Sequence, residues 1–230
     1  MKLSKELLEE MEKRYMKYWW KDDEELNYKE IVSDPFKNLI FTILSQNTSN
    51  NNTKRAYISL NKNYSIDPFT LSKVNEKELS QVIKPGGLHN IKSKRIIEVS
   101  KYIVEKYNGD INKVLSLPKE KIREELKKMK GIGDKTADVI MSSLFGQKEY
   151  FVVDTHMMRV AKRLGLVNEK ASYNEVQRAL KEFLPLEIDE EKVAGLFWLF
   201  AKYTCDKRKP KCNDCLLNYM CKYYREVLKL

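Results

Sequence analysis

Two glycines, Gly131 and Gly133, interrupt a stretch of otherwise helical pattern with only one residue between them. Apolar residues recur at helical spacing on both sides of this interruption: Ile122, Leu126 and Met129 before it, and Ala137, Ile140, Met141 and Leu144 after it. Glycine suits a turn this short because it adopts positive φ easily and lets two backbones approach closely. The stretch therefore predicts two amphipathic helices joined by a hairpin.

The hairpin also predicts where a ligand binds. Gly131, Ile132 and Gly133 lie at the start of the second helix, where backbone N–H groups have no partner within the helix. A DNA phosphate fits such a place, because the N–H groups and the helix dipole both favour an anion. Lys130, directly before the turn, adds a positive charge. These four residues are candidate DNA-binding residues.

Lys135 stands in the first turn of the second helix, where a lysine is poorly placed because that end carries partial positive charge. Two interpretations follow. Lys135 is either a surface lysine that helps to hold phosphate, or a lysine whose ammonium form is disfavoured by the helix dipole and by burial. In the second case the neutral amine is available as a nucleophile. The hairpin alone favours the first interpretation.

The segment Val153-Asp154-Thr155-His156 follows the hairpin helices. Asp-Thr before an apolar helix is a common helix start, so Asp154 is a candidate N-cap. Its carboxylate is also a candidate for acid–base chemistry and for stabilising developing positive charge. The two roles are compatible. We expect His156 to be structural.

All four cysteines fall near the C-terminal end, as Cys205, Cys212, Cys215 and Cys221. Four thiolates in the pattern C-x6-C-x2-C-x5-C suit either a tetrahedral zinc ion or an iron–sulfur cluster, and the spacing does not choose between them. With every ligand supplied by protein, a structural role is the default. The loop after Cys205 holds four basic side chains, of which Lys207 and Arg208 are candidate phosphate contacts.

The composition restricts partner and compartment. The net charge of +10 favours a polyanion such as nucleic acid or an acidic membrane. No apolar run approaches the roughly 20 residues that a membrane span needs. The N-terminus is charged and lacks the apolar core of a signal peptide. We therefore expect a cytoplasmic, nucleoid-associated protein whose cysteines are not in disulfides.

The rest of the chain also reads as helices, and no alternating strand pattern stands out, so the predicted fold class is all-α. A helix opens at Pro35 and ends in a polar stretch, residues 45–52, that begins with Ser45-Gln46. Further helices are expected at about 53–60, 76–83 and 92–107. Between the last two, Pro85-Gly86-Gly87 presents Leu88. Leu88 is either an ordinary loop residue or a wedge pushed into a duplex.

Taken in this order and spacing, the hairpin motif, the Val-Asp-Thr-His segment and the four cysteines resemble endonuclease III. This is the iron–sulfur branch of the helix-hairpin-helix DNA glycosylases. The resemblance, which extends from about Pro35 to Cys221, implies a 4Fe-4S cluster rather than zinc. It also implies two helical domains with a DNA-binding cleft between them: a barrel of helices over 27–147, and a cluster domain formed by 1–26 and 148–230.

Carried over by position, the resemblance makes Lys135 the Schiff-base lysine and Asp154 the catalytic aspartate. It makes Gln46 and Leu88 residues that fill the gap left by an extruded base. The implied activity is a bifunctional DNA glycosylase and AP lyase of base excision repair that removes damaged, oxidised pyrimidines. Its partner is double-stranded DNA with damaged bases or abasic sites, and it is expected to act as a monomer without a membrane.

Two other functions remain open. One is a mismatch glycosylase of the same superfamily, acting on G:T or on adenine; such relatives typically lack a lysine at the position of Lys135. The other is a non-catalytic DNA-binding module. Four residues depart from the family pattern: Lys130 replaces a proline, Ser49 an aspartate, His89 a tyrosine and Asp138 an asparagine. Three of these lie near the expected base pocket or wedge, so they bear on lesion preference.

Overall fold

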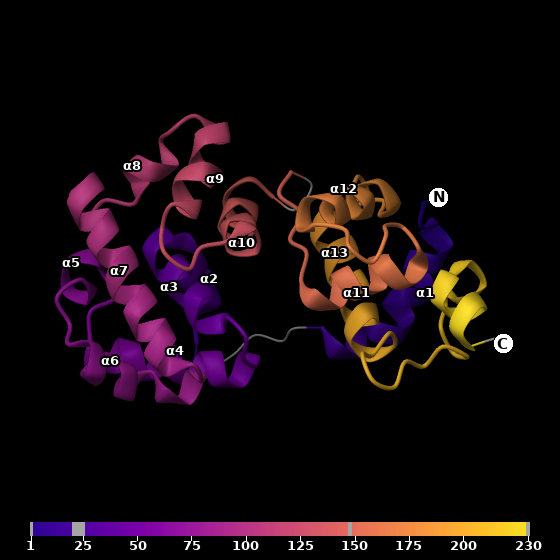
Figure 1. Cartoon of the computed structure of the whole chain (residues 1–230), viewed down its shortest axis with the longest axis horizontal. Coiled ribbons are helices and arrows are strands. Elements are labelled where there is room, and N and C mark those ends of the chain that lie inside the picture. Colours follow the sequence, from indigo (N-terminus) through magenta and orange to yellow (C-terminus); the bar gives the residue numbers. More distant parts are fainter. Residues whose placement is uncertain (1, 20–25, 147–148, 229–230) are drawn as a thin grey trace. The chain divides into compact units, whose positions relative to one another are not determined.

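The computed structural model describes residues 2–19, 26–146 and 149–228. Within these ranges every regular element is a helix and there is no strand, as Figure 1 shows. The prediction of an all-α fold is confirmed. Over the same residues, no helix combines the length and the apolar character that crossing a bilayer requires.

The chain divides into two compact units. One, here called the hairpin unit, comprises residues 22–140. The other, here called the cysteine unit, comprises residues 1–21 and 141–230. The division falls within the second helix of the hairpin motif, α10 (Asp134–Phe145). Each unit is described by itself.

The hairpin unit holds the helices that contain or surround the glycine turn. They are α2 (Tyr28–Ser33), α3 (Pro35–Ser45), α4 (Asn50–Asn63), α5 (Pro68–Leu71), α6 (Glu76–Val82), a 3-10 turn at Lys84–Gly86, α7 (His89–Tyr107), α8 (Asn112–Leu115), α9 (Lys119–Lys127) and the first half of α10. The long helix α7 packs against α3, α5 and α6 (Figure 1). Its apolar face, which includes Ile96, Val99 and Ile103, is completely buried.

Local sequence signals explain most helix starts in this unit. Pro35 is the first residue of α3, and the Asp34 carboxylate caps it by accepting from the N–H groups of Phe36 and Lys37. The prediction of a polar loop over residues 45–52 is wrong for the second half of that stretch. Ser49 accepts a hydrogen bond from the Asn52 N–H and caps α4, so residues 50–52 are helical. Helix α7 likewise begins three residues earlier than expected, at His89.

The cysteine unit joins the two ends of the chain. Its elements are α1 (Lys5–Tyr15) with a 3-10 turn at Met16–Tyr18, α11 (Thr155–Leu164), α12 (Tyr173–Phe183), α13 (Glu190–Tyr203), a 3-10 turn at Asn218–Met220 and a π-helical turn at Tyr224–Leu228. Helix α13 is central, because α1 and α11 both pack against it. A capping box between Ser172 and Glu175 starts α12.

Candidate functional site

The glycine turn has the geometry that its residues predict. Gly131 has a φ of +85°, and a Cβ added there would come within 2.5 Å of Cδ of Arg95. Only glycine fits, because the backbone is left-handed and a long side chain covers it. Ile132 is buried and anchors the turn. Gly133 is exposed, with no other part of the chain within 4 Å of the place where a Cβ would be. Its backbone is therefore accessible to a ligand.

Charged side chains join the two hairpin helices to each other. Nε of Arg123, on α9, donates to the buried carboxylate of Asp138 at 2.6 Å. The same guanidinium donates to Asp134 at 2.9 Å, and Nζ of Lys127 lies 3.0 Å from that carboxylate. The hydrogen bond from Lys127 lowers the pKa of Asp134 below its ordinary value. Asp134 and Asp138 therefore hold the start of α10 against α9.

Lys135 is exposed in the first turn of α10. The burial that the nucleophile interpretation assumes is not observed, because the residue is exposed. Its position at the positive end of a helix dipole is as expected. Lys135 lies in the hairpin unit and Asp154 in the cysteine unit.

Gln46 contacts the hairpin directly. Its Nε2 donates to the Gly131 carbonyl oxygen at 3.1 Å and to Oγ1 of Thr136 at 3.2 Å. Its Oε1 accepts from Nη1 of Arg95 at 2.6 Å. The next residue, Asn47, has a positive φ of 53°. Gln46 is therefore fixed to the hairpin by hydrogen bonds. Arg95 packs over Gly131 and also donates a hydrogen bond to Gln46.

Leu88 is presented to solvent by a strained backbone. It has φ 50° and ψ 31°, a left-handed conformation that is an outlier for a leucine. Leu88 is 48% exposed as a residue, and the neighbouring Ile91 is 50% exposed. Strain of this kind persists only where the surroundings impose it. The exposed position and the strained backbone agree with the wedge interpretation, whereas an ordinary loop leucine requires neither.

Lys92 is a buried lysine that the sequence analysis did not single out. Only 1% of the residue is exposed. Its Nζ donates to the Leu44 carbonyl at 2.6 Å and to the Gly86 carbonyl at 2.9 Å. Those carbonyls lie two residues before Gln46 and two residues before Leu88. Burial, with a smaller contribution from Arg95, lowers the pKa of Lys92 to about 8.

Asp154 caps helix α11, as one of its two predicted roles requires. Its Oδ1 accepts from the N–H groups of His156 at 2.9 Å and Met157 at 2.8 Å. Its Oδ2 accepts from the indole N–H of Trp198 at 2.8 Å. Three donors therefore hold this half-buried carboxylate. Trp198 lies on α13.

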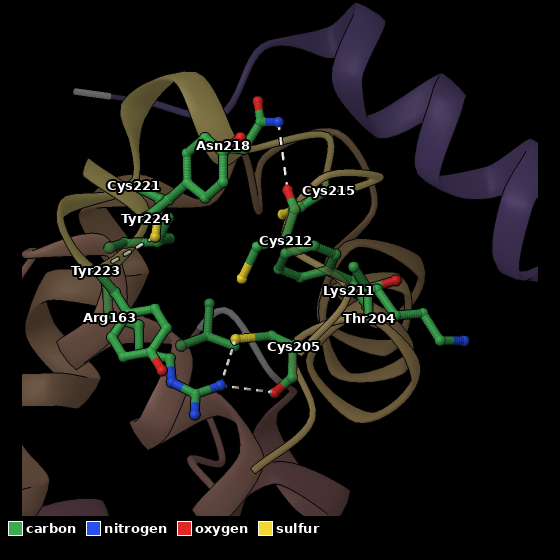
Figure 2. A pocket seen from close by; sticks show the side chains of 13 residues that line it. Arg163, Thr204, Cys205, Lys211, Cys212, Cys215, Asn218, Cys221, Tyr223 and Tyr224 are labelled. Carbon is green, nitrogen blue, oxygen red and sulfur yellow. Dashed lines mark hydrogen bonds between the residues drawn. The ribbon is translucent and has the colours of Figure 1, made fainter. Parts of the chain in front are cut away.

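The four cysteines line one cavity. Figure 2 shows their side chains around this space, which Tyr223 and Tyr224 also border. Burial raises the pKa of the Cys215 thiol to about 11 and also raises the pKa values of Cys212 and Cys221. In the part of the chain that the structure describes, no three metal-ligating side chains converge closely enough to bind one metal ion.

A cation of helix α11, Arg163, reaches this cavity. Nη1 of Arg163 lies 3.4 Å from Sγ of Cys205 (Figure 2). The same nitrogen donates to the Asp206 carbonyl at 2.7 Å, and Nη2 donates to the Lys207 carbonyl at 3.0 Å. The side chains of Lys207 and Arg208 are exposed. The loop is thus held by Arg163 through its backbone, which leaves its own basic groups in solvent.

Each of the four residues that depart from the family pattern has an observed partner. Nζ of Lys130 pairs with Glu98 at 2.8 Å. Ser49 caps α4, and Nδ1 of His89 shares a hydrogen bond of 2.7 Å with the Ser80 hydroxyl. Asp138 binds Arg123, as described above. These substitutions are therefore integrated into the fold.

Comparison with known proteins decides the family. Residues 40–186 match the model of the HhH-GPD superfamily base excision DNA repair proteins. The chain is 36% identical to endonuclease III of Thermotoga maritima over 199 residues, which is 86% of this chain and 87% of that protein. It is 30% identical to endonuclease III of Escherichia coli, over 88% of this chain and 89% of that protein.

The chain belongs to the endonuclease III family. The fold agrees: a trapped covalent endonuclease III–DNA intermediate matches 98% of the chain with a TM-score of 0.74 at 29% identity. A thermostable thymine-DNA glycosylase shares the fold, with a TM-score of 0.65 at 24% identity. Family membership makes the chain a base excision repair enzyme, a DNA glycosylase with AP lyase activity.

Proposed function

We propose that this endonuclease III relative excises oxidised pyrimidines from duplex DNA and then cleaves the strand, with Lys135 as nucleophile. The observation that carries the assignment is the exposed amine of Lys135 in the first turn of α10, directly after a hairpin whose Gly133 backbone is open to a phosphate. The hairpin amides and Lys130 then hold the DNA backbone. The enzyme acts as a monomer, and its substrate keeps it at the nucleoid of the cytoplasm.

Lys135 reacts as a neutral amine. Its Nζ forms a bond to C1′ of the sugar while the bond from C1′ to the base breaks. The electron pair leaves with the base, which takes up a proton from water. Nζ loses a proton, O4′ leaves C1′ and is protonated, and the nitrogen lone pair completes a protonated imine. Loss of a proton from C2′ then expels the 3′ phosphate from C3′, which cuts the strand on the 3′ side of the lesion.

Asp154 supports this sequence as a fixed carboxylate. Two backbone N–H groups and an indole N–H keep it in one orientation. Held in that way, it stabilises the positive charge that develops on the sugar and helps to remove the proton from Lys135. The N-cap role and the chemical role are served by the same side chain, because Oδ1 carries the cap and Oδ2 retains accepting capacity.

Gln46 and Leu88 serve base extrusion. A base must leave the stack before its C1′ can be attacked, and this unstacking costs a few kcal/mol. Leu88 is the proposed apolar wedge, because this leucine is exposed and can reach the duplex. Gln46 supplies polar groups to the opposite side of the gap, and entering the duplex requires it to exchange its bonds to the hairpin for bonds to DNA.

The four cysteines are the proposed ligands of a 4Fe-4S cluster. The donor set fits, because the residues described as lining the cavity include four thiols and neither a histidine nor a carboxylate. When bound, such a cluster supplies a rigid four-thiolate crosslink for the C-terminal loops. Cys205, Cys212, Cys215 and Cys221 would each supply one thiolate to the cluster. Lys207 and Arg208, on the loop after Cys205, then contact the phosphate backbone.

Borohydride trapping tests the proposal. Wild-type protein and Lys135→Gln are incubated with a duplex carrying one oxidised pyrimidine, one abasic site, a G:T pair or an undamaged sequence. Wild type should form a covalent adduct on the first two, and Lys135→Gln should form none while its binding to DNA persists. An adduct that survives in Lys135→Gln contradicts the assignment of the nucleophile. A preference for G:T favours the mismatch alternative.

A further inference from the structure

The indole of Trp198 is attached to the carboxylate that the proposed reaction uses. Its Nε1 lies 2.8 Å from Oδ2 of Asp154. The other carboxylate oxygen is occupied by the backbone of α11. An N-cap alone requires one oxygen. The bond from Trp198 is therefore additional to what the helix needs, and it involves the oxygen that faces away from the cap.

Further contacts hold the indole in place. Trp198 lies on α13 between Phe197 and Leu199, both of which are buried. Nζ of Lys202, one turn later, is 4.6 Å from the centre of the indole ring. The ring of His156 meets it edge to face, with centroids 6.2 Å apart. A cation over the ring draws electron density from it, which makes the N–H group a stronger donor.

We propose that Trp198 is a positioning residue for the glycosylase and lyase chemistry, acting through Asp154. Rotation about χ2 moves both carboxylate oxygens together, and the cap bonds restrain it only through Oδ1, which leaves the carboxylate some freedom to turn. The indole N–H removes that freedom and leaves the remaining lone pair of Oδ2 in one direction. A preoriented carboxylate stabilises developing positive charge without having to reorganise during the reaction. The inference rests on the proposed role of Asp154 and adds to it a residue that fixes the orientation.

Trp198→Phe is the direct test, because it keeps an aromatic ring and removes the donor. Trp19→Phe is its matched control, since it makes the same change in another half-buried tryptophan of the cysteine unit. The assay is single-turnover cleavage of a preformed abasic site, together with binding to a duplex that carries a non-cleavable abasic analogue. We expect Trp198→Phe to cleave about 10-fold more slowly or worse, as loss of a hydrogen bond to a charged group predicts. Binding should change by less than about twofold, and Trp19→Phe should behave as wild type.

A double-mutant cycle separates positioning from packing. In an Asp154→Ala background, Trp198→Phe should cause no further loss of cleavage, because the group through which it acts is gone. An equal loss in both backgrounds would mean that Trp198 only supports the fold, and the inference would fail. A Trp198→Phe enzyme that cleaves at the wild-type rate would overturn it as well.

Two controls separate this inference from the proposed function. If Asp154→Ala cleaves as well as wild type, the proposed role of Asp154 fails, and the role of Trp198 fails with it. If Asp154→Ala is slow and Trp198→Phe is normal, only the role of Trp198 fails. An NMR spectrum of the three tryptophan indole N–H groups tests the hydrogen bond without an activity assay. One of these signals should shift and exchange faster in Asp154→Ala, and the absence of any change would contradict the hydrogen bond itself.

Discussion

Gln46 is bound to the backbone of Gly131, the first glycine of the hairpin, through a hydrogen bond of 3.1 Å. The same side chain accepts from Arg95 at 2.6 Å. The proposed gap-filling glutamine and the proposed phosphate-binding turn are thus one connected surface. Entry of Gln46 into a duplex therefore has to break contacts that hold the turn.

Replacing Gln46 should reduce stability as well as excision. Gln46→Ala leaves the Arg95 guanidinium and the Gly131 carbonyl without this partner, which predicts a loss of about 1–3 kcal/mol in the free energy of unfolding. Gln46→Glu is the control, because a carboxylate still accepts from Arg95 but no longer donates to Gly131. Denaturant unfolding measures the difference. An alanine variant as stable as wild type would show that these bonds do not support the turn.

Leu88 allows stability and function to be separated. Leu88→Ala should slow excision of a damaged base more than cleavage of a preformed abasic site, because a missing base removes part of the extrusion cost. Leu88→Gly should lose excision similarly yet be at least as stable as wild type, since glycine relieves roughly 1–2 kcal/mol of left-handed strain. Single-turnover assays on both substrates and thermal unfolding give the comparison. Equal losses on the two substrates count against a wedge. Ile91→Ala, at the exposed neighbour of Leu88, shows whether Ile91 contributes to base extrusion.

The sequence predicted the parts of this fold that depend on local pattern. Helical spacing located α9 and α10, and Pro35 located the start of α3. A capping signal at Ser49 was also present but was missed. The Ser49 hydroxyl caps α4, which begins three residues before the expected start.

Lys92 could also have been recognised. It falls on the same stripe of α7 as Ile96, Val99 and Ile103, all of which are buried. A lysine at helical spacing with a core face is a candidate buried residue. Trp198 is different, because its partner Asp154 is 44 positions away and no local pattern connects them. Arg163 and Cys205, 42 positions apart, are connected in the same long-range way.

Asp154→Asn should be more damaging to the fold than a simple capping comparison implies. Asn caps a helix about as well as Asp, but its one carbonyl oxygen cannot serve both the cap and the Trp198 indole. The amide NH₂ must face one of these donors. We expect a loss of about 1–3 kcal/mol in stability and roughly 10²–10⁴-fold in turnover. Adding Trp198→Phe should give a less than additive loss of stability without restoring turnover, and denaturant unfolding with single-turnover kinetics measures both.

The metal content follows from the cysteine cavity. Protein purified without oxygen should be yellow-brown and contain about four irons and about four inorganic sulfides per chain. Cys212→Ser should reduce iron content and DNA binding more than it changes the chemistry at the sugar. Lys211→Met, a change at the exposed neighbouring side chain, should keep its iron. A colourless protein that contains one zinc ion per chain would exclude the cluster.

Lys92 predicts a pH dependence of stability whose sign is fixed by its burial. The pKa of Lys92 is lowered to about 8 in the folded protein, whereas in the unfolded chain it is close to the usual value for lysine. The unfolded state therefore binds more protons above pH 8, and the contribution of Lys92 to stability rises as the pH increases toward the unfolded pKa. The penalty for burying the ammonium is fully present below pH 8.

Lys92→Met removes this titration together with both hydrogen bonds to Leu44 and Gly86. We expect the variant to be less stable than wild type, because two buried carbonyls lose their donor. The difference in unfolding free energy should grow by about 1 kcal/mol between pH 7 and pH 9, since only the wild type gains from deprotonation. Lys94→Met, a change at the exposed lysine two positions along α7, is the control and should show no such growth. A difference that is constant with pH would show that Lys92 keeps an ordinary pKa.

Because the two carbonyls lie just before Gln46 and Leu88, Lys92→Met should also slow lesion excision more than abasic-site cleavage.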